Sequence, residues 1–294
     1  MLVQIGKRRE PKPEWLKVRM PGGGRYEHVR RTLRELNLAT VCEEASCPNM
    51  GECWGSGTAT VMLMGDVCTR GCRFCDVASG MPGPLDPLEP RHLAEAVGRL
   101  GLDYLVVTSV NRDELPDGGA SHFAQAIVEL RRAAPKTLVE VLTPDFQGEH
   151  AALQMNIDVE PTVAAHNVET VERLTPRVRD RRATYRQSLD VLELYKRGGM
   201  RTKSSIMLGL GETREEALQA MRDLRAVDCD ILTLGQYLRP TEKHLPVEEF
   251  VRPEVFDELE REGLSLGFKF VAAGPLVRSS YKAGEFFVRR WVGD

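Results

Sequence analysis

The sequence lacks long hydrophobic runs and any large excess of charge of either sign. None of its apolar stretches, within 294 residues, is long enough to cross a bilayer. The first residues, MLVQIGKRREPKPEW, are charged but lead into no apolar run, which argues against a secretion signal. Its 40 Lys+Arg and 43 Asp+Glu give a net charge of −3, so nothing indicates nucleic-acid binding. These absences predict a cytoplasmic protein that binds neither membrane nor nucleic acid and keeps its thiols reduced.

The sequence also lacks the glycine fingerprint of a dinucleotide-binding sheet after its first predicted strand, which begins near Thr58. From there to about residue 270, β-rich runs and helical segments alternate about six times, which predicts parallel βα units. We therefore expect an α/β fold, a partial (β/α)6 TIM-type barrel, with functional groups at the carboxyl ends of its strands. The expected parts are an N-terminal extension (1–57), the barrel (58–270) and a C-terminal segment (271–294).

Cysteine is the residue type whose spacing is most informative. The seven cysteines form two triplets and one single residue: Cys42, Cys47 and Cys53; Cys68, Cys72 and Cys75; and Cys229. The first triplet falls in a polar stretch that predicts a loop, and the second directly follows the first strand of the barrel. In a reducing compartment, clustered thiols indicate metal ligation more often than disulfides. The single cysteine is expected to be a small buried residue.

The second triplet, CTRGCRFC, has three thiols and no fourth ligand at a fixed spacing. Structural zinc sites usually have four protein ligands. A 4Fe-4S cluster held by three thiolates leaves one iron open to an external molecule. This spacing therefore favours a cluster over a zinc knuckle. The zinc alternative, a binding module with two zinc sites and no enzymatic activity, stays open at this point.

The CTRGCRFC segment resembles the radical S-adenosylmethionine (SAM) superfamily, in which the open iron chelates the amino and carboxylate groups of SAM. The resemblance implies further SAM contacts, each of which has a polar loop or a helix cap as its alternative explanation. The implied contacts are Asn111, Arg112 and Asp113 near the amino group, Asn167 and Glu169 at the ribose, and Ser205, Met207, Gly209 and Glu212 beside the adenine.

Two further segments, CEEASCPNMGECW (42–54) and GPLVRSSYKAGE (274–285), resemble signatures of the lipoyl synthase family. The similarity runs from about residue 11 to 287, although Asn111 stands where the family commonly has aspartate. It implies an auxiliary 4Fe-4S cluster on Cys42, Cys47 and Cys53, with a serine oxygen as fourth ligand. We assign that ligand to Ser280, with Ser279 less favoured. Because an alkoxide suits a soft iron–sulfur site less well than a thiolate, it should be displaced more easily.

The resemblance implies an enzyme that uses SAM and two 4Fe-4S clusters. Its reaction is radical sulfur insertion at C6 and C8 of an octanoyl chain on a lysine of a lipoyl carrier protein. The implied partners are dehydrogenase E2 subunits and the glycine cleavage H protein, with an electron donor such as flavodoxin or ferredoxin. A biotin-synthase-like enzyme would take its second ligand set from barrel strands, and a tRNA methylthiotransferase would need an appended RNA-binding domain.

The basic segment RVRDRR (177–182) has two possible explanations in the sequence. It predicts a solvent-facing segment, and the alternative is a surface that docks an acidic carrier domain by charge complementarity. His166 is expected to be a hydrogen-bonded residue at the end of the barrel rather than a metal ligand.

Overall fold

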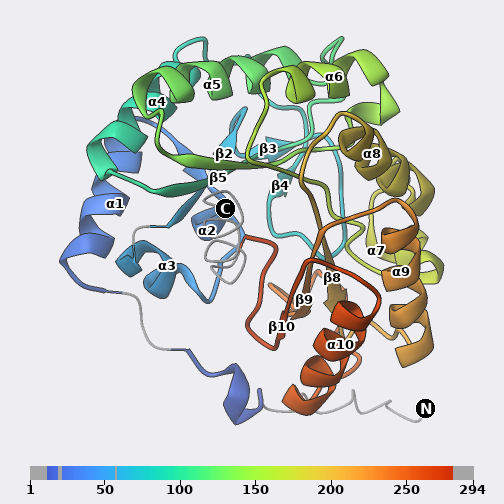
Figure 1. Ribbon diagram of the computed structural model, residues 1–294. Helices are drawn as coiled ribbons and strands as arrows, with labels where there is room; N and C mark the ends of the chain where they lie inside the picture. The colour runs from blue at the N-terminus through green and yellow to red at the C-terminus, as the bar shows by residue number, and fades with distance from the viewer. Residues whose placement is uncertain (1–11, 19–21, 57, 281–294) are drawn as a thin grey trace, which may run out of the picture.

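The computed structural model describes residues 12–18, 22–56 and 58–280, and its strands form the centre of the molecule (Figure 1). The main sheet has eight strands in the order β1-β2-β5-β6-β7-β8-β9-β10, and β3 and β4 form a separate pair. The strands are β1 (Ala39–Thr40), β2 (Ala59–Leu63), β3 (Val67–Cys68), β4 (Ala78–Ser79), β5 (Tyr104–Ser109), β6 (Leu138–Leu142), β7 (Val163–Ala165), β8 (Thr202–Leu208), β9 (Ile231–Gln236) and β10 (Phe270–Gly274).

Helices cover the outer face of this sheet, as the arc from α4 through α6 and α8 to α10 shows (Figure 1). The helices are α1 (Gly24–Glu35), α2 (Val41–Glu44), α3 (Met50–Ser56), α4 (Glu89–Leu100), α5 (Ala120–Ala133), α6 (His150–Asp158), α7 (Thr175–Val178), α8 (Tyr185–Arg197), α9 (Arg214–Ala226) and α10 (Pro253–Ser265). Short 3-10 turns lie at η1 (Glu14–Leu16), η2 (Phe146–Gly148) and η3 (Glu172–Leu174).

The sheet confirms the predicted partial barrel. From β2 to β10 neighbouring strands run parallel, and within the described residues the terminal strands β1 and β10 do not pair with each other. The added strand β1 pairs antiparallel with β2. Strand β10 pairs with β9 as a seventh parallel strand, one more than the six repeats expected from the sequence.

Local sequence signals explain several boundaries. Helix α4 ends at Gly101, whose φ of 57° is in the left-handed region that glycine adopts readily. Helix α9 begins at Thr213, which forms a capping box with Glu216. The first cysteine triplet differs from the predicted loop, because α2 and α3 contain two of its cysteines. The Thr40 side chain accepts a hydrogen bond from the Glu43 backbone N–H at 3.2 Å, and this cap helps to form α2.

The barrel interior carries one buried ion pair among its apolar side chains. Lys203 Nζ lies 2.7 and 2.9 Å from the two carboxylate oxygens of Glu140, and Tyr104 donates to the same carboxylate at 2.6 Å. Both oxygens of the buried carboxylate therefore have a hydrogen-bond donor inside the core. Cys229 is fully buried, as predicted. Among the described helices, none is both long enough and apolar enough to span a membrane.

Candidate functional site

The second cysteine triplet lies on a loop at the carboxyl end of β2, here called the cysteine loop (68–75). Its first residue, Cys68, belongs to the small pair of strands β3 and β4. The Cys68 sulfur accepts hydrogen bonds from the backbone N–H groups of Arg70, at 3.4 Å, and Asn111, at 3.3 Å. The Cys72 sulfur accepts one from the Asp180 N–H at 3.3 Å. Such donors stabilise thiolate sulfur and tune the potential of iron–sulfur clusters.

Burial controls the protonation of the cysteine thiols. It raises the pKa of Cys75 to about 12 and also raises the pKa of Cys72. In the first triplet, burial and the nearby Cys47 thiol raise the pKa of Cys42 to about 11. These thiols are therefore protonated at neutral pH unless a metal deprotonates them. All seven cysteines are free of disulfides, as a metal-ligating role requires.

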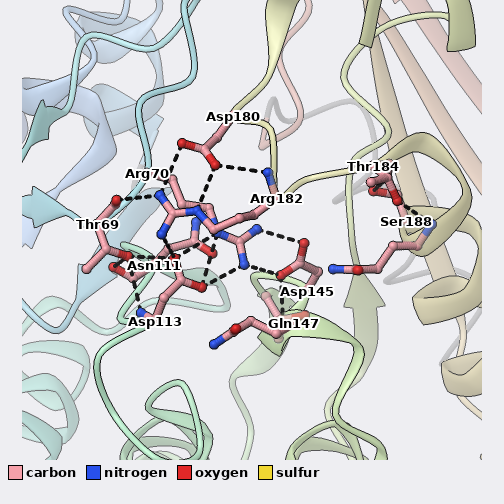
Figure 2. Close-up of polar contacts among 12 residues, drawn as sticks. Thr69, Arg70, Asn111, Asp113, Asp145, Gln147, Asp180, Arg182, Thr184 and Ser188 are labelled. Atoms are coloured by element: carbon pink, nitrogen blue, oxygen red, sulfur yellow. Dashed lines mark hydrogen bonds and ion pairs between the residues drawn. The ribbon is translucent and has the colours of Figure 1, made fainter. Parts of the chain in front are cut away.

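A buried ion network fixes the cysteine loop to the ends of two strands. The Arg70 guanidinium, 2% exposed, pairs with Asp113 after β5 and with Asp145 after β6, each with a shortest distance of 2.7 Å. Figure 2 shows this guanidinium between the two carboxylates, with Arg182 and Asp180 beside them. Asp180 also accepts a hydrogen bond from the Gly71 backbone N–H at 3.0 Å. The network therefore determines where the loop lies above the barrel.

The first cysteine triplet comes from α2, the turn after it, and α3. The Cys47 N–H donates to the Cys42 carbonyl at 3.0 Å, which brings two of the three residues together. Burial raises the pKa of Cys47, while the neighbouring Arg278 guanidinium lowers it. The Asn49 amide donates to the Leu276 carbonyl at 2.6 Å, across 227 residues of sequence. This triplet therefore lies beside the segment that contains the predicted serine ligand.

A direct link also joins the two cysteine-bearing regions. The Ser46 hydroxyl, next to Cys47, donates to the Asp76 carboxylate, next to Cys75, at 3.1 Å. One cavity of about 500 Å³ is lined by Cys47 from the first triplet, by all three cysteines of the loop, and by Ser279 and Ser280. Its size is typical of small-molecule sites. Cys42 and Cys53 lie behind it, buried against the core.

The arrangement of the cysteine thiols suits iron–sulfur clusters better than single metal ions. Within the described residues, no three His, Cys, Asp or Glu side chains lie close enough to hold one metal ion. A four-iron cluster places each protein ligand on a different iron and so needs its ligands further apart than one ion does. Three thiols around one loop, with N–H donors aimed at two of the sulfurs, fit this requirement.

The predicted SAM contacts divide into two groups by position. Five line the cavity: Asn111, Asn167, Glu169, Ser205 and Met207. The remaining four are not among its lining residues: Arg112, Asp113, Gly209 and Glu212. Arg112 donates to the carbonyls of Met64 and Gly83, and Glu212 accepts from the N–H groups of its own loop. All nine assignments stay predictions, and the second group supports the loops around the cavity.

The cavity wall offers polar atoms to a ligand. Among the described residues, Asn167 Oδ1, Ser109 Oγ and Arg179 Nε are buried and have no hydrogen-bond partner, although each residue lines the cavity. Buried polar atoms in folded proteins are nearly always paired, so these three indicate a polar ligand. Burial raises the pKa of the neighbouring Glu169 carboxyl, which accepts a hydrogen bond from the Asn167 amide at 3.1 Å. The Asn167 amide oxygen, the Ser109 hydroxyl and the Arg179 guanidinium together suit the ribose and carboxylate of SAM.

Sequence reasoning missed the position or role of several residues around the cysteine loop. The segment 177–182 was predicted to face solvent, but Arg179 is buried and lines the cavity. Arg70 and Asp145 were not singled out, because isolated charged residues give no signal of a contact across 75 residues. His166 is hydrogen-bonded to Thr143 and Ser188 as predicted, and burial lowers its pKa to about 4.

Comparison with known proteins adds two family matches. Residues 62–224 match the radical SAM superfamily, and residues 2–47 match the N-terminal domain of lipoyl synthase of the radical SAM family. The chain is 62% identical over 280 residues to "Lipoyl synthase" of Myxococcus xanthus, covering 95% of this chain and 94% of the relative. It is 58% identical over 280 residues to "Lipoyl synthase" of Thermus thermophilus, covering 94% and 87%.

Solved structures support the fold. Methylornithine synthase matches with a TM-score of 0.56 at 14% identity, covering 73% of this chain and 70% of that one. HydG, a maturase of the FeFe-hydrogenase, matches with a TM-score of 0.58 at 14% identity, covering 83% and 66%. The sequence matches show that the chain belongs to the lipoyl synthase family of the radical SAM superfamily.

Proposed function

We propose that the two cysteine triplets hold the two 4Fe-4S clusters of a lipoyl synthase. Cys68, Cys72 and Cys75 hold the cluster that binds SAM, and Cys42, Cys47 and Cys53 hold the auxiliary cluster. Ser280 supplies the fourth auxiliary ligand, with Ser279 as the less favoured choice. The observation that carries the proposal is one shared cavity, because cysteines from both triplets and both serines line it.

The enzyme inserts sulfur at C6 and C8 of an octanoyl chain on a lysine of a lipoyl carrier protein. When bound, SAM and its cluster supply the radical that removes hydrogen from the chain, and the auxiliary cluster supplies the sulfur. The protein residues bind and orient these groups. Asn167 and Arg179 offer buried polar atoms to SAM, and the Ser46–Asp76 hydrogen bond keeps the two ligand regions adjacent.

The finer assignments belong to the same proposal. The carriers are dehydrogenase E2 subunits and the glycine cleavage H protein, the electron donor is a flavodoxin or a ferredoxin, and the protein is cytoplasmic. Seven cysteines without a disulfide support a reducing location. We also propose three functional parts: the extension (1–57), the barrel (58–270) and a C-terminal segment (271–294) that returns to the auxiliary cluster. The Asn49–Leu276 hydrogen bond supports this return.

Metal analysis tests the ligand sets. Anaerobically reconstituted protein should contain about eight irons and eight sulfides per chain. Replacing either triplet by alanine should lower both values to about four, whereas the Cys229→Ala variant should keep all eight. Zinc without sulfide would overturn the cluster assignment.

Product analysis tests the reaction. Reduced enzyme, SAM and an octanoyl-lysine peptide should give the 6,8-dithiolated peptide, detected by mass spectrometry. The Ser280→Ala variant should still form 5′-deoxyadenosine while losing most of the thiolated product, and Ser279→Ala should lose less. Equal losses of thiolated product in the two variants would contradict the assignment of Ser280 as the ligand.

A further inference from the structure

The outer side of the cysteine loop carries an exposed cation between two other basic segments. The Arg73 side chain is exposed, although its residue lies between two proposed cluster ligands. Its backbone N–H donates to the Val178 carbonyl at 2.9 Å, and its carbonyl accepts from the Leu245 N–H at 3.2 Å. The segments 177–182 and 239–244 therefore lie next to Arg73.

These neighbours give the surface a positive charge. The segments 71–76, 177–182 and 239–244 contain seven Arg and Lys residues against three Asp and Glu residues, in a chain whose net charge is −3. We call three exposed residues of these segments the cationic surface: Arg73, Arg181 and Lys243. Within the part of the chain that the structure describes, none of the three has an ion-pair partner. Exposed cations of this kind attract acidic partners and speed their association.

The cationic surface approaches the cysteine loop from outside the cavity. Cys72 and Cys75 line the cavity, whereas Arg73, Arg181 and Lys243 do not. Gly71 of the same loop is exposed as well, so part of the loop reaches the protein surface here. A partner bound here would come close to the cluster ligands and leave the cavity free for SAM and the octanoyl chain.

We infer that the cationic surface docks an acidic electron-transfer protein that reduces the cluster held by the cysteine loop. The inference rests on the proposed function, since it assumes that cluster. In each encounter the donor gives up one electron and is oxidised, and the cluster is reduced by the same electron. A carrier domain fits this surface less well, because it must present its acyl chain to the cavity and this surface lies outside the cavity lining.

The test compares a protein donor with a chemical one. Arg181→Glu/Lys243→Glu leaves the cysteine loop intact and reverses two charges beside it. Flavodoxin reduced to its hydroquinone is the protein probe, and dithionite is the chemical reductant. In the variant we expect the flavodoxin KM and its Kd, measured by calorimetry on holoenzyme, to rise roughly tenfold. The rate of product formation with dithionite as the reductant should not change, because dithionite is small and needs no docking surface.

A matched control reverses two exposed cations elsewhere. Lys136 and Lys269 precede β6 and β10, so they lie at the amino ends of the strands, opposite the cysteine loop. Lys136→Glu/Lys269→Glu changes the net charge by the same amount, and we expect an unaltered flavodoxin Kd. An equal weakening in both variants would reveal a net-charge effect and overturn the docking site.

Two further outcomes would also overturn the inference. One is an unchanged flavodoxin KM and Kd in Arg181→Glu/Lys243→Glu. The other is a raised KM for an octanoylated carrier protein in the dithionite assay, which would assign the surface to the carrier. Failure of the proposed function is visible separately, because wild-type enzyme would then give no thiolated product even with dithionite, while flavodoxin binding would still be measurable.

Discussion

Replacing Arg70 with methionine should destabilise the protein more than any substitution of an exposed charge. The change removes the guanidinium but keeps a side chain of similar length. It leaves two carboxylates without their main partner, and the side chains of Asp113 and Asp145 are only 11% and 1% exposed. Breaking a buried ion pair by removing one partner typically costs about 3–5 kcal/mol. We expect a loss of unfolding free energy in this range.

Two companion variants separate charge from geometry. Arg70→Lys keeps the charge, but one ammonium cannot bind both carboxylates as the planar guanidinium does, so the loss should be roughly 1–3 kcal/mol. Arg182→Met removes a neighbouring cation whose side chain is 40% exposed, and exposed pairs contribute only about 0–1 kcal/mol. Urea unfolding of reduced, cluster-free protein gives each free energy from its midpoint and slope.

The pH dependence gives a second measurement on the same variant. Burial alone would raise the pKa of Asp113 and Asp145, but hydrogen bonds from Arg70 outweigh it and leave both pKa values below 3.8. Because the pKa values are lower in the folded state, this stabilisation is present above about pH 4 and lost as the pH falls below it. Arg70→Met should therefore lose less stability on acidification than the wild type. A free-energy loss under about 1 kcal/mol with an unaltered acid response would refute the reasoning.

The remaining predictions concern the barrel and the cavity. Gly235→Ala should release the auxiliary cluster, lowering iron from about eight to about four per chain, because a Cβ there would lie 2.0 Å from the Val277 carbonyl oxygen. Lys203→Met should cost about 3–5 kcal/mol in urea unfolding, since it leaves the buried Glu140 carboxylate without its cation. Asn167→Ala should weaken SAM binding roughly two- to tenfold in equilibrium dialysis, by loss of one hydrogen-bonding group.

Each of these has a control that isolates its cause. Gly98→Ala, at an exposed position of α4 where the new Cβ would meet no other part of the protein within 4 Å, should keep all the iron. The double variant Lys203→Met/Glu140→Leu should recover most of the stability lost in the single variant, because no unpaired charge remains. Asn156→Ala, buried in α6 and away from the cavity, should leave the SAM affinity unchanged. Loss of iron in Gly98→Ala, no recovery of stability in the double variant, or weaker SAM binding in Asn156→Ala would each contradict the corresponding prediction.

Most of the fold could be predicted from the sequence because its signals are local. Helix α4 ends at Gly101, and Thr213 with Glu216 forms the capping box at the start of α9, so both boundaries follow from residues next to them in the sequence. The alternation of β-rich and helical segments in the sequence predicted the partial barrel. The short helices α2 and α3 were missed, because four and seven residues carry too little hydrophobic periodicity to be recognised.

Where spacing alone carries the information, the sequence indicated part of the candidate site, and the ligand assignments there stay predictions. Cysteines three and four residues apart on one loop must lie close together, whatever the rest of the chain does. The polar supports could not be found in this way, because Arg70 meets Asp145 only after β2, β5 and β6 align. The burial of Arg179 had no local signal either, since its neighbours in RVRDRR resemble any solvated basic segment.

The hydrogen bond between Asn49 and Leu276 has a consequence for the biogenesis of the enzyme. The three thiols of the cysteine loop are present once the first quarter of the chain has been synthesised. The other proposed ligand set is complete only when the polypeptide has grown past Ser280. A prematurely terminated product could therefore acquire the machinery that generates radicals without the means to use them for sulfur transfer. Because the C-terminal segment completes the auxiliary ligand set last, sulfur donation would be the last capability that a newly made molecule acquires.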